Sequence, residues 1–270
     1  MKKIKLAVLM LCVLCLFAAS AAAQQPAWTY PIKATTLDDK TGLLVLANTT
    51  SLIPEDYVPY HLVNTYLRAT NAGMQLRQEA ADALKRMFED ATSAGYTLYI
   101  KSAYRSYQTQ NTMYQNRLEK YNKDDGVVAA PGTSDHQTGL AVDILNYAWT
   151  QQDGMRPEFS QTAEAKWMAE NCAKYGFILR YMEDKQEVTG IIFEPWHFRY
   201  VGEEVAAYMM ENHLSLEEFT AEYQQAIASF EQAGGDFKAY VKAQRELPPP
   251  IIISGDEEGE SEVSLFYQTP

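Results

Sequence analysis

The stretch PGTSDHQTGLAVDI places a serine, a histidine and two aspartates within a few positions, directly before an apolar run. A serine nucleophile needs a neighbouring base and a sharp, exposed turn with an oxyanion hole. Ser134 and His136 are two positions apart, and the stretch lacks the G-x-S-x-G pattern of such a turn. The residue types and their spacing therefore disfavour a serine hydrolase triad and leave a metal site or a capped turn.

A metal site would use different members of the same stretch. Zinc binds histidine nitrogen and carboxylate oxygen, and a catalytic zinc site keeps three protein ligands and one open position. His136 and Asp143 supply two such ligands. Strand alternation puts Asp143 on the face opposite Leu140, Val142 and Ile144. A lone carboxylate in an apolar strand is costly unless it is paired or binds a metal, so a salt bridge is the alternative.

The segment FEPWHFRY offers the third ligand and a base. Glu194 and His197 are three residues apart, so their Cα atoms lie at most about 10 Å from each other. The chain has four histidines, and His136 and His197 are the two in acid-bearing segments beside expected strands. His61 and His213 have no such neighbours and are interpreted as structural or surface residues. The alternative for His197 is a buried histidine that hydrogen-bonds the backbone.

The elements that must position these residues follow from apolar periodicity and turn signals. Strands are expected at 43–50, 96–104, 139–145, 177–181 and 191–202, and helices at 76–94, 106–121, 161–175, 203–213, 215–232 and 236–247. Met113, Tyr114 and Leu118 would share one face of the second helix. Asp135, beside His136, is expected to be exposed and not a ligand. Strands interleaved with helices, with few clean β-α-β units, predict a single α+β domain.

The ends of the chain have a different character. MKKIK and the apolar run LAVLMLCVLCLFAAS, followed by AAAQ, have the layout of a secretory signal, with cleavage expected after Ala23. Cys172 would then be the only cysteine, which excludes an internal disulfide. Losing three lysines with the signal shifts the formal net charge from −12 to −15. An acidic chain without basic clusters argues against a nucleic-acid partner. No membrane anchor is expected after cleavage.

Three segments together resemble a known family. SAYRSYQTQ, SDHQTGLAVDI and EPWHFRYVG, in this order, are similar to the VanY-type D-alanyl-D-alanine carboxypeptidases, zinc enzymes that trim peptidoglycan stem peptides. The S-x-H-x-x-G-x-A-x-D pattern is met by Ser134, His136, Gly139, Ala141 and Asp143, and the E-x-W-H pattern by Glu194, Trp196 and His197. The resemblance covers about 43 to 215.

The resemblance implies roles residue by residue. His136, Asp143 and His197 match the family's Zn²⁺ ligands, and Glu194 matches its catalytic base. Arg105 matches an arginine near the scissile carbonyl, although a structural ion pair is the alternative. Ser134 and Gln110 match polar residues that hold the substrate, although Ser134 could also cap a turn. The implied fold is a small, mixed, largely antiparallel sheet flanked by helices, shared with the Hedgehog domain, with a helical C-terminal extension.

The resulting expectation is a secreted, zinc-dependent carboxypeptidase of the cell envelope that removes the terminal D-alanine from peptidoglycan stem peptides. Its bounds would be 43–215, after a signal peptide at 1–23 and an N-terminal segment at 24–42, and before a helical extension at 216–246 and an acidic, flexible tail at 247–270. An L,D-carboxypeptidase acting on tetrapeptide stems is the alternative within the enzyme class. A non-catalytic zinc module that binds cell wall or a partner is the alternative outside it, and the presence of Glu194 favours an enzyme.

Overall fold

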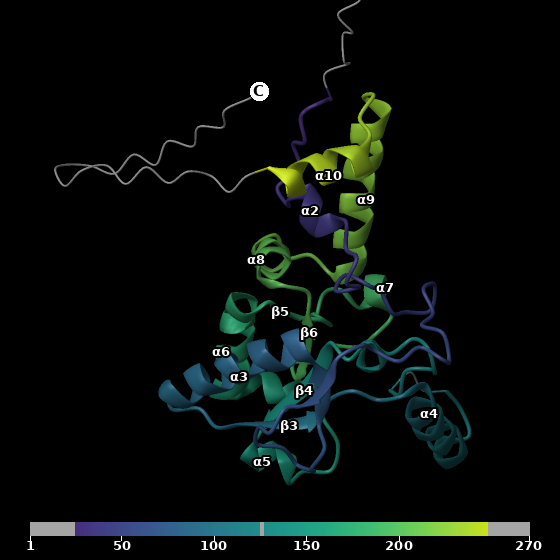
Figure 1. The fold of residues 1–270 in the computed structure, drawn as a ribbon. Helices are drawn as coiled ribbons and strands as arrows, with labels where there is room; N and C mark the ends of the chain where they lie inside the picture. The colour runs from purple at the N-terminus through teal and green to yellow at the C-terminus, as the bar shows by residue number, and fades with distance from the viewer. Residues whose placement is uncertain (1–24, 125–126, 248–270) are drawn as a thin grey trace, which may run out of the picture. The chain divides into compact units, whose positions relative to one another are not determined.

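The computed structural model describes residues 25–124 and 127–247 (Figure 1). The chain divides into two compact units, one running from Tyr30 to Ala226 and the other combining the segments on either side of it. The division falls inside helix α9 (Leu216–Gln232). Every residue expected to carry chemistry lies in the larger unit. The expected signal peptide and most of the expected acidic tail lie outside the described residues.

The larger unit is built on a four-stranded antiparallel sheet. Its order is β3 (Leu98–Ser102), β4 (Ala141–Asn146), β6 (His197–Tyr200) and β5 (Phe177–Leu179). A separate hairpin joins β1 (Leu62–Asn64) to β2 (Gln75–Arg77). In the β4–β6 register Asp143 lies directly opposite His197. The two central strands therefore bring together residues that are more than fifty positions apart in the chain.

Helices surround this sheet. Besides the first part of α9, the larger unit has the α-helices α2 (Ala34–Leu37), α3 (Gln78–Ser93), α4 (Tyr107–Tyr121), α5 (Tyr147–Thr150), α6 (Ala163–Asn171), α7 (Gln186–Thr189) and α8 (Glu203–Glu211). Its 3₁₀ turns are η1 (Asp135–Thr138), η2 (Pro157–Gln161) and η3 (Cys172–Tyr175). α3 buries an apolar stripe against the sheet, as its periodicity predicts. Val142 and Ile144 join this hydrophobic cluster, whereas Asp143 faces away from it. The sheet therefore has one apolar face and one face available for polar chemistry.

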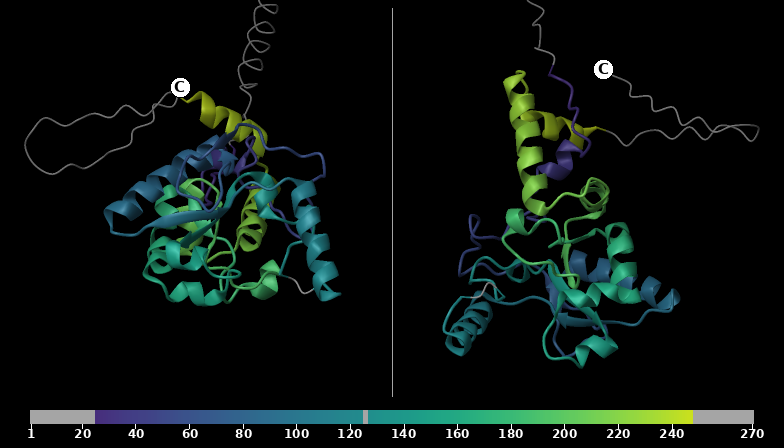
Figure 2. Two further views of the ribbon diagram at one scale, coloured as in Figure 1. Left: turned by 90° about the horizontal axis from the view of Figure 1, so that it is seen from below. Right: turned by 180° about the vertical axis from the view of Figure 1, so that it is seen from behind.

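Helix α4 is an exception to this packing. It stands away from the sheet in the views of Figures 1 and 2, and Gln110 is its one buried residue. Met113, Tyr114 and Leu118, expected on one face, are not buried, and Met113 is 37% exposed. The helix itself is confirmed, and Ser106 caps it by accepting a hydrogen bond from the Thr109 backbone N–H at 3.2 Å.

The strand expected at 43–50 is also wrong. The segment is irregular apart from an isolated bridge between Asn48 and Ser51. Side chains bind the backbone groups that a strand ladder would use: Asp39 accepts the N–H of Leu43 and Leu44 at 3.0 and 2.7 Å, and Arg199 donates to the carbonyl oxygens of Leu43 and Val45.

The smaller unit contains the end of α9 and helix α10 (Phe237–Glu246), which Asp236 caps at the Ala239 N–H. Trp28 packs its ring against Phe230 at 5.6 Å and against Phe237 at 5.4 Å between centroids. An aromatic cluster thus joins residues from both segments of this unit.

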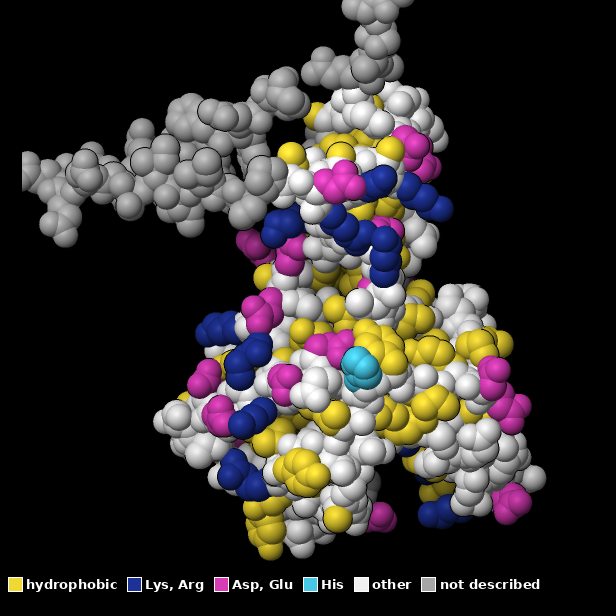
Figure 3. All heavy atoms as spheres, viewed as in Figure 1, with side chains coloured by type: hydrophobic (Ala, Val, Ile, Leu, Met, Phe, Trp, Pro, Cys, Tyr) yellow, Lys and Arg dark blue, Asp and Glu magenta, His cyan; other side chains and the backbone are white. Residues whose placement is uncertain are grey.

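Two surface properties bear on the expected partners. On the face drawn in Figure 3, lysine and arginine side chains are interspersed with aspartate and glutamate, and the formal net charge of the chain is −12. Among the described helices, none is both long and apolar enough to span a bilayer.

Candidate metal and catalytic centre

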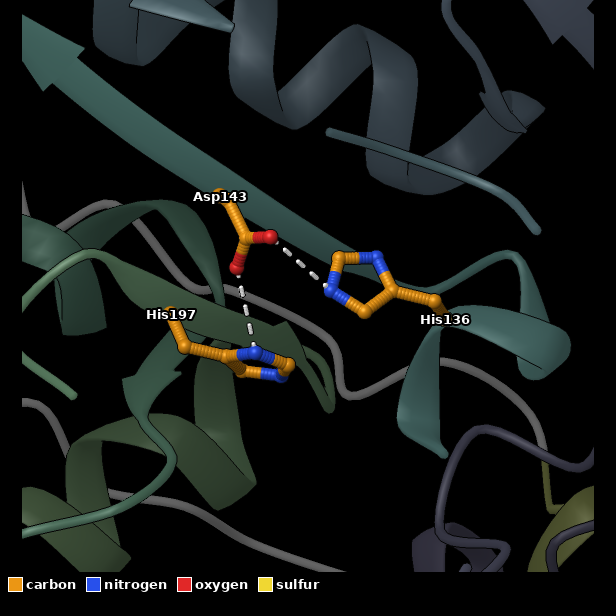
Figure 4. A group of neighbouring side chains, drawn as sticks. All are labelled: His136, Asp143 and His197. Carbon is orange, nitrogen blue, oxygen red and sulfur yellow. Dashed lines mark ion pairs between the residues drawn. The ribbon is translucent and has the colours of Figure 1, made fainter. Parts of the chain in front are cut away.

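His136, Asp143 and His197 meet at one point on the polar side of the sheet (Figure 4). His136 Nε2 lies 3.2 Å from Asp143 Oδ2, and His197 Nδ1 lies 3.2 Å from Asp143 Oδ1. All three side chains are buried. Two ligand atoms bound tetrahedrally at 2.0–2.2 Å from a zinc ion would be about 3.4 Å apart. The spacing of the three side chains therefore fits a single ion.

Two buried atoms of the cluster lack hydrogen bonds within the described part of the chain, which also supports a metal site. His136 Nε2 and Asp143 Oδ1 are buried, yet neither makes a hydrogen bond to any described residue. Buried polar atoms are almost always satisfied, so unsatisfied atoms that converge on one point indicate a missing common partner. Two imidazole nitrogens and one carboxylate form a donor set that suits Zn²⁺.

A glycine three residues after His136 shapes the turn that holds it. The 3₁₀ turn η1 ends at Gly139, whose φ of +69° is the left-handed conformation that favours glycine. A Cβ atom there would lie 3.0 Å from Leu62 and 3.1 Å from Pro59. The turn leads straight into β4, which carries Asp143. His136 Nδ1 lies 2.7 Å from the Ala103 carbonyl oxygen, so Nδ1 carries the proton and Nε2 is free to bind a metal.

Electrostatic interactions keep the side chains of His136 and Asp143 in the protonation states that bind a metal. Burial, with a smaller contribution from Arg105, lowers the pKa of His136 to about 4, so the imidazole is neutral at pH 7. Burial alone would raise the pKa of Asp143, but His136 and His197 beside it hold that pKa far below its ordinary value. A neutral imidazole and an anionic carboxylate are the forms that coordinate metals.

Glu194 lies next to this cluster. Its Oε2 atom is 3.4 Å from His197 Nδ1, and its backbone N–H donates to the Tyr181 carbonyl oxygen at 3.1 Å. Burial raises its pKa to about 7, Asp143 adds to the rise, and His197 and Arg105 oppose it. A carboxylate whose pKa lies near neutral pH is well suited to take up and release a proton.

Arg105 and Ser134 lie next to each other, close to His136. Arg105 Nη2 is 3.5 Å from Ser134 Oγ, and the Arg105 backbone N–H donates to the His136 carbonyl oxygen at 3.2 Å. Burial lowers the pKa of Arg105, while the charges of Asp143 and Glu194 oppose that shift. The guanidinium thus lies within electrostatic reach of both acids of the site.

Gln110 is buried on the first turn of α4. Its Nε2 donates to the Ala129 carbonyl oxygen at 2.6 Å, and its Oε1 has no hydrogen-bond partner among the described residues. The remaining two histidines lie elsewhere. His61 packs against Tyr60 in a left-handed conformation, and His213 pairs with Asp184 at 2.9 Å on the surface.

Asp135 is buried, and the expectation that it is exposed is wrong. Its side chain is 0% exposed and lies between two arginines, Arg180 and Arg199, that are equally buried. Burial would raise its pKa, but these two guanidinium groups outweigh it and hold the pKa below its ordinary value. The signal in the sequence was the pair of arginines inside the apolar segments FILRY and HFRYV, since a buried guanidinium requires an acid.

Comparison with known proteins places the chain in a family. The family model described as D-alanyl-D-alanine carboxypeptidase, VanY, matches residues 73–203. The chain is 34% identical over 191 residues to the bifunctional D-Ala-D-Ala dipeptidase and D-Ala-D-Ala carboxypeptidase VanXYC of Enterococcus gallinarum, covering 69% of this chain and 98% of that protein. The chain belongs to the VanY family of D-alanyl-D-alanine carboxypeptidases. The matched range contains every candidate site residue described above.

Solved structures of VanY-family relatives share the fold. The LdcB LD-carboxypeptidase is 39% identical with a TM-score of 0.62, over 66% of this chain and 86% of that one. The vancomycin-resistance D,D-pentapeptidase VanY from a VanB-type cassette, solved in complex with Zn(II), is 32% identical with a TM-score of 0.54, over 66% and 98% of the two chains. The expected α+β fold is therefore confirmed, and the chain is an enzyme of the carboxypeptidase type.

Proposed function

We propose that this VanY-family protein is a secreted, zinc-dependent carboxypeptidase that removes the terminal D-alanine from peptidoglycan stem peptides. The observation that carries the proposal is the convergence of two imidazoles and a carboxylate on one point, with a second carboxylate, Glu194, 3.4 Å from His197 Nδ1. Three ligands together with a separate base form the minimal set for metal-assisted hydrolysis.

His136 Nε2, Asp143 and His197 Nδ1 would hold the ion. When bound, zinc supplies a Lewis acid that polarises the scissile carbonyl and makes water more acidic. Glu194 takes a proton from the attacking water and passes it to the nitrogen of the departing D-alanine. Its raised pKa suits both transfers, since it can act as a base first and as an acid afterwards.

Arg105 and Ser134 would serve the substrate. Attack on the carbonyl carbon places negative charge on the carbonyl oxygen, and the buried guanidinium of Arg105 provides a fixed positive charge for it. Ser134 would hold the terminal carboxylate, helped by Gln110. One N–H of the Gln110 amide already donates to Ala129, so only its second N–H is left for the carboxylate, and we expect Ser134 to contribute more to this contact.

Secretion is supported by the sequence of residues 1–23, which has the charge and apolar layout of a signal peptide. A stem peptide is an extracytoplasmic substrate, so the expected location in the cell envelope and the expected substrate agree. We also propose the domain bounds expected from the sequence, with the catalytic domain at 43–215.

An L,D-carboxypeptidase is the second candidate, favoured by one observation. The LdcB LD-carboxypeptidase has a higher identity and TM-score against this chain than the D,D-pentapeptidase does, at 39% and 0.62 compared with 32% and 0.54. The two activities differ in the configuration of the residue before the scissile bond. A pentapeptide stem ending in D-Ala-D-Ala and a tetrapeptide stem ending in a single D-alanine distinguish them.

The experiment measures release of D-alanine from both stems by the protein expressed without residues 1–23. We expect release that a chelator abolishes and added zinc restores. Glu194→Gln should still bind one zinc ion but lose nearly all turnover, because an amide cannot accept the proton. Glu187→Gln, an exposed glutamate of α7, is the matched control and should behave as wild type. Zinc binding without release from either stem would support the binding module instead.

A further inference from the structure

The two nitrogens of His197 have different surroundings. Nδ1 faces Asp143 and Glu194 at 3.2 and 3.4 Å. Nε2 is buried on the opposite side of the ring and makes no hydrogen bond to any described residue. Asp135 Oδ2 lies 4.0 Å from Nε2. The ring thus lies between the candidate metal position and a second, separate carboxylate.

A metal-binding histidine normally has its other nitrogen fixed by an acceptor, and this acceptor selects the tautomer. His136 has such an acceptor in the Ala103 carbonyl oxygen at 2.7 Å. For His197, the ring contacts come from Tyr181 and His136, each with a centroid separation of 4.8 Å. These ring contacts hold the plane of the imidazole but do not decide which nitrogen carries the proton.

Asp135 is held where it can make that selection. Arg180 Nε donates to its Oδ2 at 2.8 Å, and Arg199 Nη1 donates to its Oδ1 at 2.7 Å. Arg180 also donates twice to Glu217, at 2.8 and 2.7 Å. The charges of the two arginines and the two acids therefore sum to zero. The Arg180 backbone N–H in turn donates to the His197 carbonyl oxygen at 3.2 Å. The Asp135 carboxylate is therefore fixed relative to the strand that carries His197.

We propose that Asp135 is a positioning residue for His197: its carboxylate keeps the proton on Nε2 and leaves Nδ1 free to bind the metal. At 4.0 Å the contact is electrostatic and not a hydrogen bond. An Nε2–H dipole pointing at a carboxylate is favourable, whereas the opposite tautomer would point a nitrogen lone pair at the same negative charge. A buried, low-dielectric site strengthens this preference, which has to exceed the opposite preference that Asp143 and Glu194 give to a proton on Nδ1. The role rests on the zinc-dependent function proposed above.

Asp135→Asn and Glu217→Gln form a matched pair for the test. Each replaces one carboxylate bound to Arg180 by the amide of the same shape, and only Asp135 faces His197. Zinc affinity is measured by competition with a chromogenic chelator, at a temperature where urea unfolding shows both metal-free variants to be folded. Loss of an outer-sphere partner of a ligand typically weakens metal binding about 10- to 100-fold. We expect that loss for Asp135→Asn and wild-type affinity for Glu217→Gln.

The outcomes separate the two proposals. Equal zinc affinities for both variants, whether reduced or unchanged, would overturn the positioning role of Asp135 but leave the proposed function intact. A wild-type protein that binds no zinc would overturn both.

A measurement on the wild-type protein covers the case in which Asp135→Asn does not fold. In the zinc-free protein with ¹⁵N-labelled histidine, the ring nitrogen shifts report the tautomer, and we expect His197 to carry its proton on Nε2. A neutral His197 with its proton on Nδ1 would overturn the proposal.

Discussion

Replacing Glu194 by glutamine should stabilise the metal-free protein at neutral and alkaline pH while removing its activity. The Glu194 side chain is 17% exposed, and burial is the main cause of a pKa of about 7 in the folded protein, compared with 4.5 for an unperturbed glutamate. Because the folded-state pKa is the higher one, the protonated carboxyl contributes stability that is complete below pH 4.5 and lost as the pH rises through 7. Glutamine has nearly the same shape and no proton to lose.

The size of the effect follows from the two pKa values. At about 1.4 kcal/mol per pKa unit, a rise in the Glu194 pKa from 4.5 to about 7 lowers the free energy of unfolding of the wild type by about 3 kcal/mol at pH 8 and about 1 kcal/mol at pH 5. Urea unfolding in the presence of EDTA at these two pH values measures the free energy of unfolding. The free energy of unfolding of Glu194→Gln should exceed that of the wild type by about these amounts. That of Glu187→Gln, on the surface, should match the wild type at both pH values.

Two results would refute this reasoning. A stability difference that is equal at pH 5 and pH 8 would mean that Glu194 does not titrate in the folded protein between these values. A Glu194→Gln variant less stable than wild type at pH 8 would mean that the carboxylate makes net favourable contacts. In the zinc-loaded protein the cation favours the ionised carboxylate, so there we expect the pH dependence of the difference to shrink.

Three further outcomes follow from the site. His197→Ala should lose zinc binding, measured by dialysis and metal analysis, whereas the wild type should bind one ion with ligand distances of about 2.0–2.2 Å in an X-ray absorption experiment. Ser134→Ala should weaken cleavage about 10- to 100-fold, mainly through KM, and Arg105→Ala should act mainly on kcat. Amidating the substrate's C-terminus should erase the effect of Ser134→Ala and leave that of Arg105→Ala. If amidation instead erased only the effect of Arg105→Ala, the roles of the two residues would be exchanged. Gly139→Ala should lower the free energy of unfolding by about 1–3 kcal/mol in a urea titration, because a left-handed alanine is strained and its Cβ would press on Leu62; an unchanged value would show that the turn relaxes freely.

The sequence predicted the centre of the site better than its surroundings. His136 and Asp143 lie in one short motif and His197 in a second, and β4–β6 pairing brings the three side chains together as expected. Asp135 was misjudged because its partners, Arg180 and Arg199, lie at least 45 positions away in the chain. Local polarity predicts exposure, and it cannot reveal a charge pair that forms only after the sheet has assembled.

The errors in the fold have the same origin. The segment 43–50 has the composition of a strand, but Asp39 and Arg199 bind its backbone groups, and Arg199 lies more than 150 positions away. Helix α4 was predicted with nearly correct bounds, since its residues and its cap are local. Whether a face of this helix is buried depends on neighbours that periodicity does not identify.

The aromatic cluster around Trp28 has a consequence for the order in which the protein matures. The Asp236 backbone N–H donates to Gln25 Oε1 at 2.9 Å, and the two residues are 211 positions apart. Trp28 is synthesised soon after the expected signal, yet Phe230 and Phe237, its ring partners, lie more than 200 positions later in the chain. A ribosome has therefore translated the whole segment from Tyr30 to Ala226 before the smaller unit can assemble. A premature stop after Ala226 would leave Trp28 without these rings, and it would produce a chain with every candidate site residue but without this late-assembling unit.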